Sequence, residues 1–219
     1  MSEELATAIS RERFEALWTR CLDSISVMDA APVYKNLMNC YAEPHRRYHS
    51  CGHLEHCLHE FDRAAAMIKD RDAVEMALWF HDAVYVPGAS DNEQRSADLF
   101  ADWSKGFLRP SLVTKVCSLI LITMHTQAPK NEEGCYAVDI DLSSFGIPWD
   151  NFVQDSRNVR AEQTGVKDVD FYPEQRRFLE SLIKRPRIYH TEYFHARYEE
   201  SARQNINRLL NLIATEGKV

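Results

Sequence analysis

Apolar residues recur along this chain at intervals of three and four, the spacing that places side chains on one face of an α-helix. No stretch shows the apolar–polar alternation of a half-buried strand bounded by hairpin turns. Proline and glycine interrupt the helical pattern repeatedly, as helix stop signals do. The pattern therefore predicts an all-α fold, with helices at residues 3–27, 32–42, 50–69, 72–85, 90–105, 109–126, 132–145, 149–163, 172–184 and 191–215.

The chain has 219 residues, of which 45% are hydrophobic, so it is long enough to bury one core. No repeat or long linker divides it. We expect a single compact multi-helix domain spanning 1–219. Helix 191–215 carries apolar side chains at mixed threes and fours, which predicts a docking face, and we expect it to pack with helix 3–27 on a core of about residues 40–190.

The formal net charge of −7 argues against nucleic acid polymers and anionic membranes as partners, although a local basic pocket for a phosphate stays open. The first residues include acids where a secretory signal would carry lysines, and no run approaches the roughly 18 apolar residues that span a membrane. The six cysteines form no CxxC pair, which favours reduced core residues over a zinc knuckle or disulfides. We therefore expect a cytoplasmic protein.

Four histidines crowd the stretch RYHSCGHLEHCLHEF. His49 and His53 are four residues apart, and on a helix they would share one face. His56 shares that face and could support them, although an exposed position is the leading expectation. The other histidines are predicted to be ordinary solvated side chains: His45, His59, His190 and His195.

Three further segments place polar side chains in apolar surroundings. ALWFHDAVY ends with the pair His81-Asp82, YAVDIDLSSFG contains Asp139 and Asp141, and LILITMHT reaches His125. A carboxylate beside so many apolar residues is unfavourable unless it is paired or binds a cation. A histidine on one helix, a His-Asp pair on a second and an aspartate on a third offer ligands suited to Mn, Mg, Co, Ni, Fe or Zn. Water in the remaining positions would mark a catalytic metal and hence a hydrolase.

The order His53, then His81-Asp82, then Asp141 resembles the H…HD…D signature of the HD-domain superfamily of metal-dependent phosphohydrolases, including the 28-residue spacing between the two histidines. The segments YHSCGH, HDAVYVPGASDN and DLSS are similar to those of cyclic-nucleotide phosphodiesterases. Val86 stands where those enzymes have a histidine, which argues against cyclic nucleotides as substrates. Over residues 40–190 the chain resembles predicted HD phosphohydrolases of bacteria and fungi.

The resemblance implies a divalent metal ion held by His53, His81, Asp82 and Asp141, so that Asp82 belongs to the catalytic machinery. It also implies that His49 protonates the leaving oxygen. The implied activity is hydrolysis of a small phosphate ester, with a nucleotide as the leading expectation, by hydroxide formed at the metal. The alternatives are a non-catalytic regulatory protein that binds a nucleotide or phosphate ligand, and a protein that a metal merely stabilises.

Other residues are candidates for substrate contacts. Arg46 and Arg47 precede His49 and could bind a phosphate through charge-assisted hydrogen bonds. Asn92, in the turn after the HD pair, and His125 are the further candidates.

Some alternatives stay open at this point. Asp139 and Asp141 are two residues apart and cannot point the same way on a helix, and the DLSS segment favours Asp141 as the ligand. Arg160 and Glu162 could form a buried ion pair or a pocket wall. The metal species, the number of ions and any homo-oligomeric state are also open.

Overall fold

The computed structural model describes residues 2–219, with side chains from Arg11 onward. Within this range every regular element is a helix and there is no β-strand, so the predicted all-α class is confirmed. The elements are α1 (Ser2–Cys21), α2 (Ala31–Tyr41), α3 (Cys51–Ala64), η1 (Ala65–Met67), α4 (Arg71–Phe80), α5 (Asn92–Ser104), α6 (Pro110–Ile122), α7 (Glu132–Asp141), η2 (Leu142–Gly146), α8 (Trp149–Glu162), α9 (Asp168–Ile183) and α10 (Glu192–Glu216).

Local sequence explains where several helices begin and end. Asp70, Asn131 and Thr191 cap α4, α7 and α10, since in each case the side-chain oxygen accepts a backbone N–H of the first turn. Pro110 opens α6, where its missing N–H would have had no partner inside the helix. Gly217 ends α10 with a positive φ of 69°, a conformation that glycine adopts without strain.

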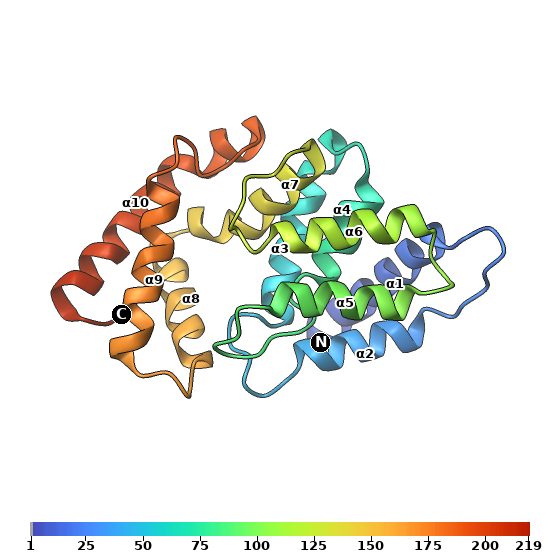
Figure 1. Cartoon of the computed structure of the whole chain (residues 1–219), viewed down its shortest axis with the longest axis horizontal. Helices are drawn as coiled ribbons and strands as arrows, with labels where there is room; N and C mark the ends of the chain where they lie inside the picture. Colours follow the sequence, from blue (N-terminus) through green and yellow to red (C-terminus); the bar gives the residue numbers. More distant parts are fainter. Residues whose placement is uncertain (1) are drawn as a thin grey trace.

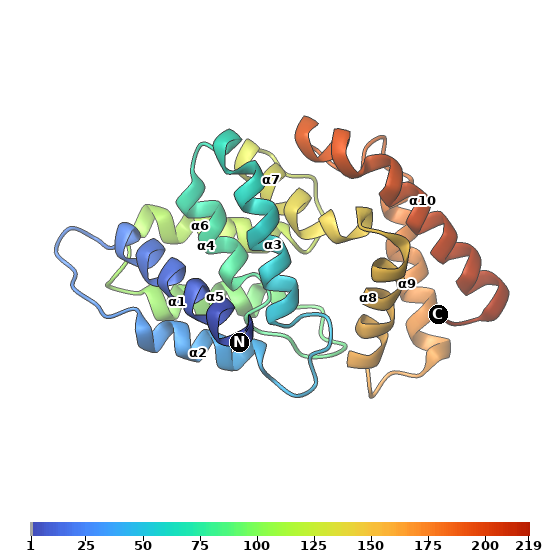
Figure 2. The same cartoon turned by 180° about the vertical axis from the view of Figure 1, so that it is seen from behind.

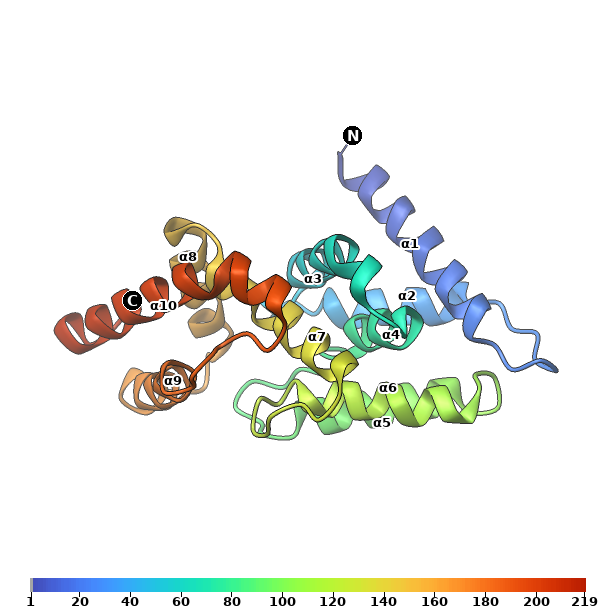
Figure 3. The same ribbon diagram turned by 90° about the horizontal axis from the view of Figure 1, so that it is seen from above.

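The helices gather in two groups along the long axis of the molecule (Figure 1). Helices α1 to α6 form one end, α8 to α10 form the other, and α7 with η2 leads from the first to the second (Figures 2 and 3). The first group encloses an aromatic core in which the rings of Phe14 and Trp79 meet edge to face at 5.2 Å. Helix α1 contacts α2 and α4, whereas α10 contacts η2, α8 and α9.

The N-terminal helix ends at Cys21, so its predicted extension to residue 27 is wrong. The chain leaves the helix because it pairs instead with the segment before α6: Asp23 donates its N–H to the carbonyl of Phe107 at 2.8 Å. The apolar residues Ile25 and Val27, which suggested a longer helix, are almost fully exposed on the connecting loop.

Three other predicted helices are also too long, and each real end lies at the candidate site. The helices predicted at 72–85, 109–126 and 132–145 end at Phe80, Ile122 and Asp141. Consequently His81 and Asp82 follow α4 directly, while His125 lies in a loop with a positive φ of 56°. At the end of α4, tertiary contacts override the helical pattern, because Arg46 donates hydrogen bonds to the carbonyls of Asp82 and Ala83.

Two smaller differences occur elsewhere. The helix predicted at 50–69 divides into α3 and η1, and the helix predicted at 172–184 begins earlier, at Asp168. No helix among residues 2–219 combines the length and the apolar character that crossing a membrane requires.

Candidate metal centre

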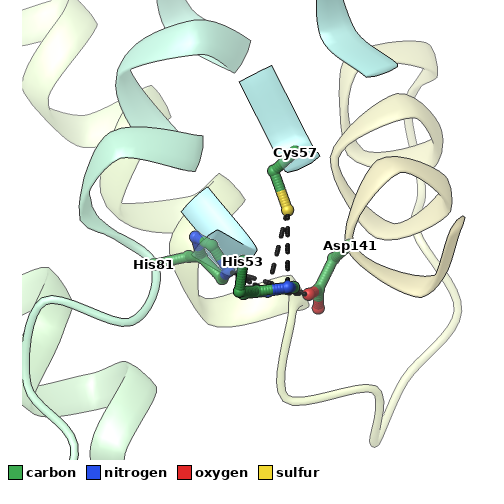
Figure 4. Close-up of side chains that lie close together, drawn as sticks. All are labelled: His53, Cys57, His81 and Asp141. Carbon is green, nitrogen blue, oxygen red and sulfur yellow. Dashed lines mark hydrogen bonds and ion pairs between the residues drawn. The ribbon is translucent and has the colours of Figure 1, made fainter. Parts of the chain in front are cut away.

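Two imidazoles and a carboxylate from three elements converge in the interior. Nε2 of His53, on α3, lies 3.2 Å from Nε2 of His81, which follows α4, and 3.2 Å from Oδ1 of Asp141, at the end of α7. The third edge, between His81 Nε2 and Asp141 Oδ1, measures 3.6 Å. Both imidazoles are buried, and Figure 4 shows the side chains pointing toward one another. We call these side chains, together with Asp82, the cluster.

Two further side chains can complete a set of four donors. Oδ2 of Asp82 lies 3.2 Å from His81 Nε2 and 3.6 Å from His53 Nε2. On another side, Sγ of Cys57 lies 3.6 Å from His53 Nε2 (Figure 4). Donor atoms of His53, Cys57, His81 and Asp141 all lie within 4.8 Å of one another. This buried group could therefore hold a metal ion.

The separations fit the size of a metal site. Zinc bonds of about 2.0–2.1 Å to nitrogen and about 2.3 Å to sulfur place tetrahedral ligands roughly 3.3 Å apart, or roughly 3.6 Å apart when one is sulfur. The nitrogen–oxygen distances of 3.2 and 3.6 Å and the sulfur–nitrogen distance of 3.6 Å lie close to these values. In addition, His81 Nδ1 lies 2.8 Å from the carbonyl oxygen of Leu78. A proton held there leaves the lone pair on Nε2, the atom that faces the cluster.

The electrostatics of the cluster favour a positive charge between the carboxylates. Burial alone would raise the pKa of Asp141, but contacts with His125, His53 and His81 hold that pKa well below its usual range. Burial likewise disfavours charge on His81, yet the carboxylates of Asp82 and Asp141 raise the pKa of this imidazole well above its usual value. The two carboxylates thus draw cationic charge to the centre, and a divalent ion can supply it.

His125 lies beside the cluster and does not belong to its centre. Its Nε2 lies 2.8 Å from Oδ2 of Asp141, on the oxygen that does not face His53. Its Nδ1 is buried and has no hydrogen-bond partner. This contact orients the Asp141 carboxylate so that Oδ1 stays directed at the two imidazoles.

The structure places His49 near His53, but for a different reason from the predicted shared helix face. Helix α3 begins at Cys51, so His49 precedes it and the argument from helical spacing was wrong. Glu162, at the end of α8, positions this histidine. Oε1 of Glu162 accepts the backbone N–H groups of Arg47, Tyr48 and His49 at 2.7 to 2.9 Å, and Oε2 lies 2.7 Å from His49 Nδ1.

This pairing affects the charge of both partners. Burial opposes charge on His49, but the carboxylates of Asp82 and Glu162 outweigh it and raise the pKa of the imidazole. Burial would raise the pKa of Glu162, whereas the bonds from His49 and the backbone lower it. Arg160 is bound to Asp168 instead, so the ion pair of Arg160 with Glu162, one of the two alternatives for these residues, does not form.

Arg46 supports the backbone around the cluster. It is not among the described residues that line a cavity beside the cluster. Its buried guanidinium donates to the carbonyls of His49, Asp82 and Ala83 at 2.7 to 3.0 Å, and its Nε donates to Glu43. These bonds take up the carbonyls after α4 that a longer helix would have used. The donors of Arg46 are therefore committed within the protein.

Two other predicted substrate contacts also lie away from this cavity. Arg47 is exposed, and the side-chain amide of Asn92 is paired with both backbone groups of Val86, at 2.9 and 3.2 Å. Among the described residues that line the cavity there is no Arg46, Arg47 or Asn92, whereas His125 does line it. Of the four candidates for substrate contacts, only His125 is among the described residues of the lining.

Asp139 and Asp141 lie on different sides of α7, as their spacing predicted. The buried carboxylate of Asp139 accepts the backbone N–H groups of His190 and Thr191 at 2.8 and 2.7 Å and the Thr191 hydroxyl at 2.7 Å. Burial raises its pKa to about 6 despite these bonds. Asp139 thus holds the start of α10, and Asp141 is the residue at the cluster.

The remaining histidines have varied surroundings. His56 is half-buried, with Nε2 2.8 Å from the Ser143 hydroxyl, so the expected exposure was wrong. His59 is exposed, as predicted, whereas His45, His190 and His195 are half-buried.

The sequence reasoning missed Cys57 and Glu162 as parts of the site. Cys57 follows His53 by four residues, so helical spacing alone could have placed it on the same face. No local signal could have paired Glu162 with a histidine 113 residues away.

A cavity of about 720 Å³ opens beside the cluster. Asp82, Asp141, His49 and His125 line it at the cluster, and much of the remaining wall comes from α8 and α9. This volume can hold a molecule of nucleotide size next to the converging donor atoms.

Searches with this chain match no family model, no curated protein and no solved structure.

Proposed function

We propose that the chain is a divalent-metal-dependent phosphohydrolase of the HD-domain superfamily and that its substrate is a small phosphate ester, such as a nucleotide. One observation carries the proposal: the Nε2 atoms of His53 and His81 lie 3.2 Å from each other, and each lies 3.2 to 3.6 Å from an oxygen of Asp82 and of Asp141, two residues that line a cavity. Donors that face one another so closely are expected to bind a cation, and the cavity gives a ligand access to it.

These four residues would hold the metal ion. When bound, a divalent cation polarises a phosphoryl group and lowers the pKa of a coordinated water molecule. The Asp141 carboxylate is kept in position by His125, and His81 is kept in the required tautomer by the carbonyl of Leu78.

His49 would protonate the leaving oxygen. Its Nδ1 is engaged by Glu162 at 2.7 Å, so Nε2 is the ring nitrogen that remains for a ligand, and the residue lines the cavity. A carboxylate bonded to Nδ1 stabilises the protonated imidazole, as it does in other acid–base catalysts. Glu162 is therefore a positioning residue for His49.

The test is a screen for phosphate release. Protein stripped of metal would be supplied with Mn, Mg, Co, Ni or Zn and assayed against nucleotides and simple phosphomonoesters. We expect metal-dependent turnover in the parent protein. His49→Gln should lower kcat by about 100-fold without changing metal content, because general acid catalysis contributes roughly 10²–10⁴-fold.

His59→Gln is the matched control, because His59 lies on the neighbouring helix and is exposed. It should leave turnover unchanged. If nucleotides raise the melting temperature of the metal-loaded protein but no phosphate is released with any metal, the chain is a regulatory ligand-binding protein and the hydrolytic proposal is wrong.

A further inference from the structure

The cavity beside the cluster has an aromatic wall. Phe145 of η2, Phe152 of α8 and Phe178 of α9 all line it. The ring of Phe145 lies 5.5 Å from that of Phe152 and 6.3 Å from that of Phe178, centre to centre. Phe171 lines the same wall. Aromatic faces of this kind bind flat apolar groups, and they also attract organic cations.

The lining of this cavity is also rich in carboxylates. Asp155 of α8 and Glu93 of α5 line the cavity in addition to Asp82 and Asp141 of the cluster. Among the described residues of its lining, none is lysine or arginine. Acidic side chains thus outnumber basic ones in the cavity wall, which is unfavourable for a second anionic group on the ligand.

The carboxylate of Asp155 is half-buried and has no partner among the described residues. Within residues 11–219 it makes no hydrogen bond or ion pair, although other buried acids, such as Asp139 and Glu162, are fully bonded. Burial raises the pKa of Asp155 and of Glu93. An unpaired carboxylate in a partly desolvated site would be stabilised by a ligand that brings a positive charge or strong donors.

Two other polar groups of the same lining also have a free atom. Gln175 bonds Ser156 through one end of its amide at 3.0 Å, and the other end is buried without a partner. His125 is more than nine-tenths buried, and its Nδ1 is unpaired. Two residues of the lining therefore have a polar atom that no described residue satisfies.

We infer that the preferred ligand is a phosphomonoester whose alcohol portion is an aromatic ring bearing a cationic nitrogen. This inference rests on the proposed function for the position of the phosphate. The phosphate would lie at the cluster beside His49, the ring would pack on Phe145, Phe152 and Phe178, and the nitrogen would approach Asp155. Hydrolysis would break the ester P–O bond and form a P–O bond to the oxygen of water. His49 would give its proton to the leaving oxygen, so the products are inorganic phosphate and the free alcohol. Nucleoside polyphosphates fit less well, since no lysine or arginine is among the described residues that line the cavity.

Three synthetic esters that differ only in charge test the inference. They are para-aminomethylphenyl phosphate, para-methylphenyl phosphate and para-carboxyphenyl phosphate, which carry an ammonium, a methyl and a carboxylate group. We expect kcat/KM for the ammonium ester to exceed that for the methyl ester by about tenfold, as one unscreened charge contact allows. The carboxylate ester should be the poorest substrate.

Asp155→Asn should reduce the preference for the ammonium ester to about twofold or less while leaving kcat/KM for the methyl ester nearly unchanged. Asp150→Asn removes the same charge from an exposed position on α8 and is the matched control, which should keep the preference. Equal kcat/KM values for the three esters, or an unchanged preference in Asp155→Asn, would overturn the inference.

A binding experiment separates this inference from the proposed activity. Calorimetry with phosphate-free para-methylbenzylamine, para-methylbenzyl alcohol and para-methylbenzoate should show the tightest binding for the amine, and Asp155→Asn should weaken it by about tenfold. If the amine binds in this way but none of the esters is hydrolysed, the proposed function fails and the cavity inference stands. If all three esters are hydrolysed without charge preference, the proposed function stands and the inference fails.

Discussion

The carboxylates in two regions of this molecule have different surroundings. One region is the cluster. The other is the α10 junction, by which we mean residues 186–205 together with Asp139 and η2. At the junction Asp139 accepts two backbone N–H groups, and Glu199 accepts those of Ile188 and Tyr189 at 3.0 to 3.1 Å.

In the cluster, no backbone N–H bonds to Asp82 or Asp141 among the described residues, and these carboxylates face imidazole nitrogens instead. The comparison distinguishes two uses of a buried acid. A carboxylate saturated by N–H donors fixes the chain, because removing it leaves those donors unsatisfied. In the cluster, carboxylate oxygens and imidazole nitrogens face one another and compete for the same proton. The carboxylates there are therefore available to bind a cation. Substitutions in the two regions should therefore affect different measurements, metal binding for the first region and stability for the second.

The largest expected effect is on the cluster. His81→Ala or Asp141→Asn should weaken divalent-metal binding by about 1,000-fold or more, since each removes one of the few ligands, and should abolish turnover. Metal content by elemental analysis and isothermal titration would measure the loss, and circular dichroism would verify that the helices remain. Full metal content in either variant would contradict the assignment.

Metal affinity also decides whether Asp82 or Cys57 is the fourth ligand of the metal ion. Our proposal assigns it to Asp82, so Cys57→Ser should keep metal affinity within about tenfold of the parent, whereas Asp82→Asn should lose it. The reverse result would make Cys57 the ligand and would favour a thiophilic ion such as zinc.

At the α10 junction we expect the largest effect on stability from Asp139→Ala. It leaves the N–H groups of His190 and Thr191 without an acceptor, which should lower the free energy of unfolding by about 3 kcal/mol. Urea unfolding of the metal-free protein would measure this change. Asp150→Ala, at an exposed acid, is the control and should cost less than about 1 kcal/mol. Unchanged stability combined with lost metal would place Asp139 in the cluster instead.

A smaller loss of stability is expected from Gly146→Ala. A methyl group at this position would lie 2.6 Å from Cβ and 2.7 Å from Cδ1 of Tyr198, so η2 and α10 would have to separate. We expect a loss of about 2 kcal/mol in the free energy of unfolding. Gly165→Ala is the matched control, because nothing lies within 4 Å of the added carbon. Equal effects of the two substitutions would show that close packing at Gly146 is unimportant.

The smallest expected effect is the pH dependence of the stability that Glu199 contributes. Burial would raise the pKa of Glu199, but the N–H groups of Ile188 and Tyr189 together with Arg203 lower it. A lowered pKa in the folded state means that the ionised group stabilises the fold above the unfolded pKa of about 4.3 and that this stability is lost as the pH falls through the folded value. The difference in unfolding free energy between the parent and Glu199→Gln should therefore narrow between pH 5 and 3. A difference that stays constant over that window would show that the charge of Glu199 is not involved.

The sequence by itself determined the helical class and most of the cluster. Apolar periodicity reports helices because the pattern depends on neighbours within one or two turns. The same local pattern marked His81, Asp82, Asp139 and Asp141, since polar residues stand out in apolar segments, and it showed that Asp139 and Asp141 diverge on a helix. The choice of His53 and of Asp141 came from the resemblance to the HD-domain superfamily.

Only the tertiary structure decided what these residues contact. The positive charge of Arg46 suggested that it binds a phosphate, yet its guanidinium binds carbonyls that become available where α4 ends. Glu162 reaches His49 across 113 residues, and Asp155 lines the cavity because α8 lies beside η2. These partnerships depend on which surfaces the packed helices bring together. That choice is made by burial over the whole chain, and local pattern does not encode it.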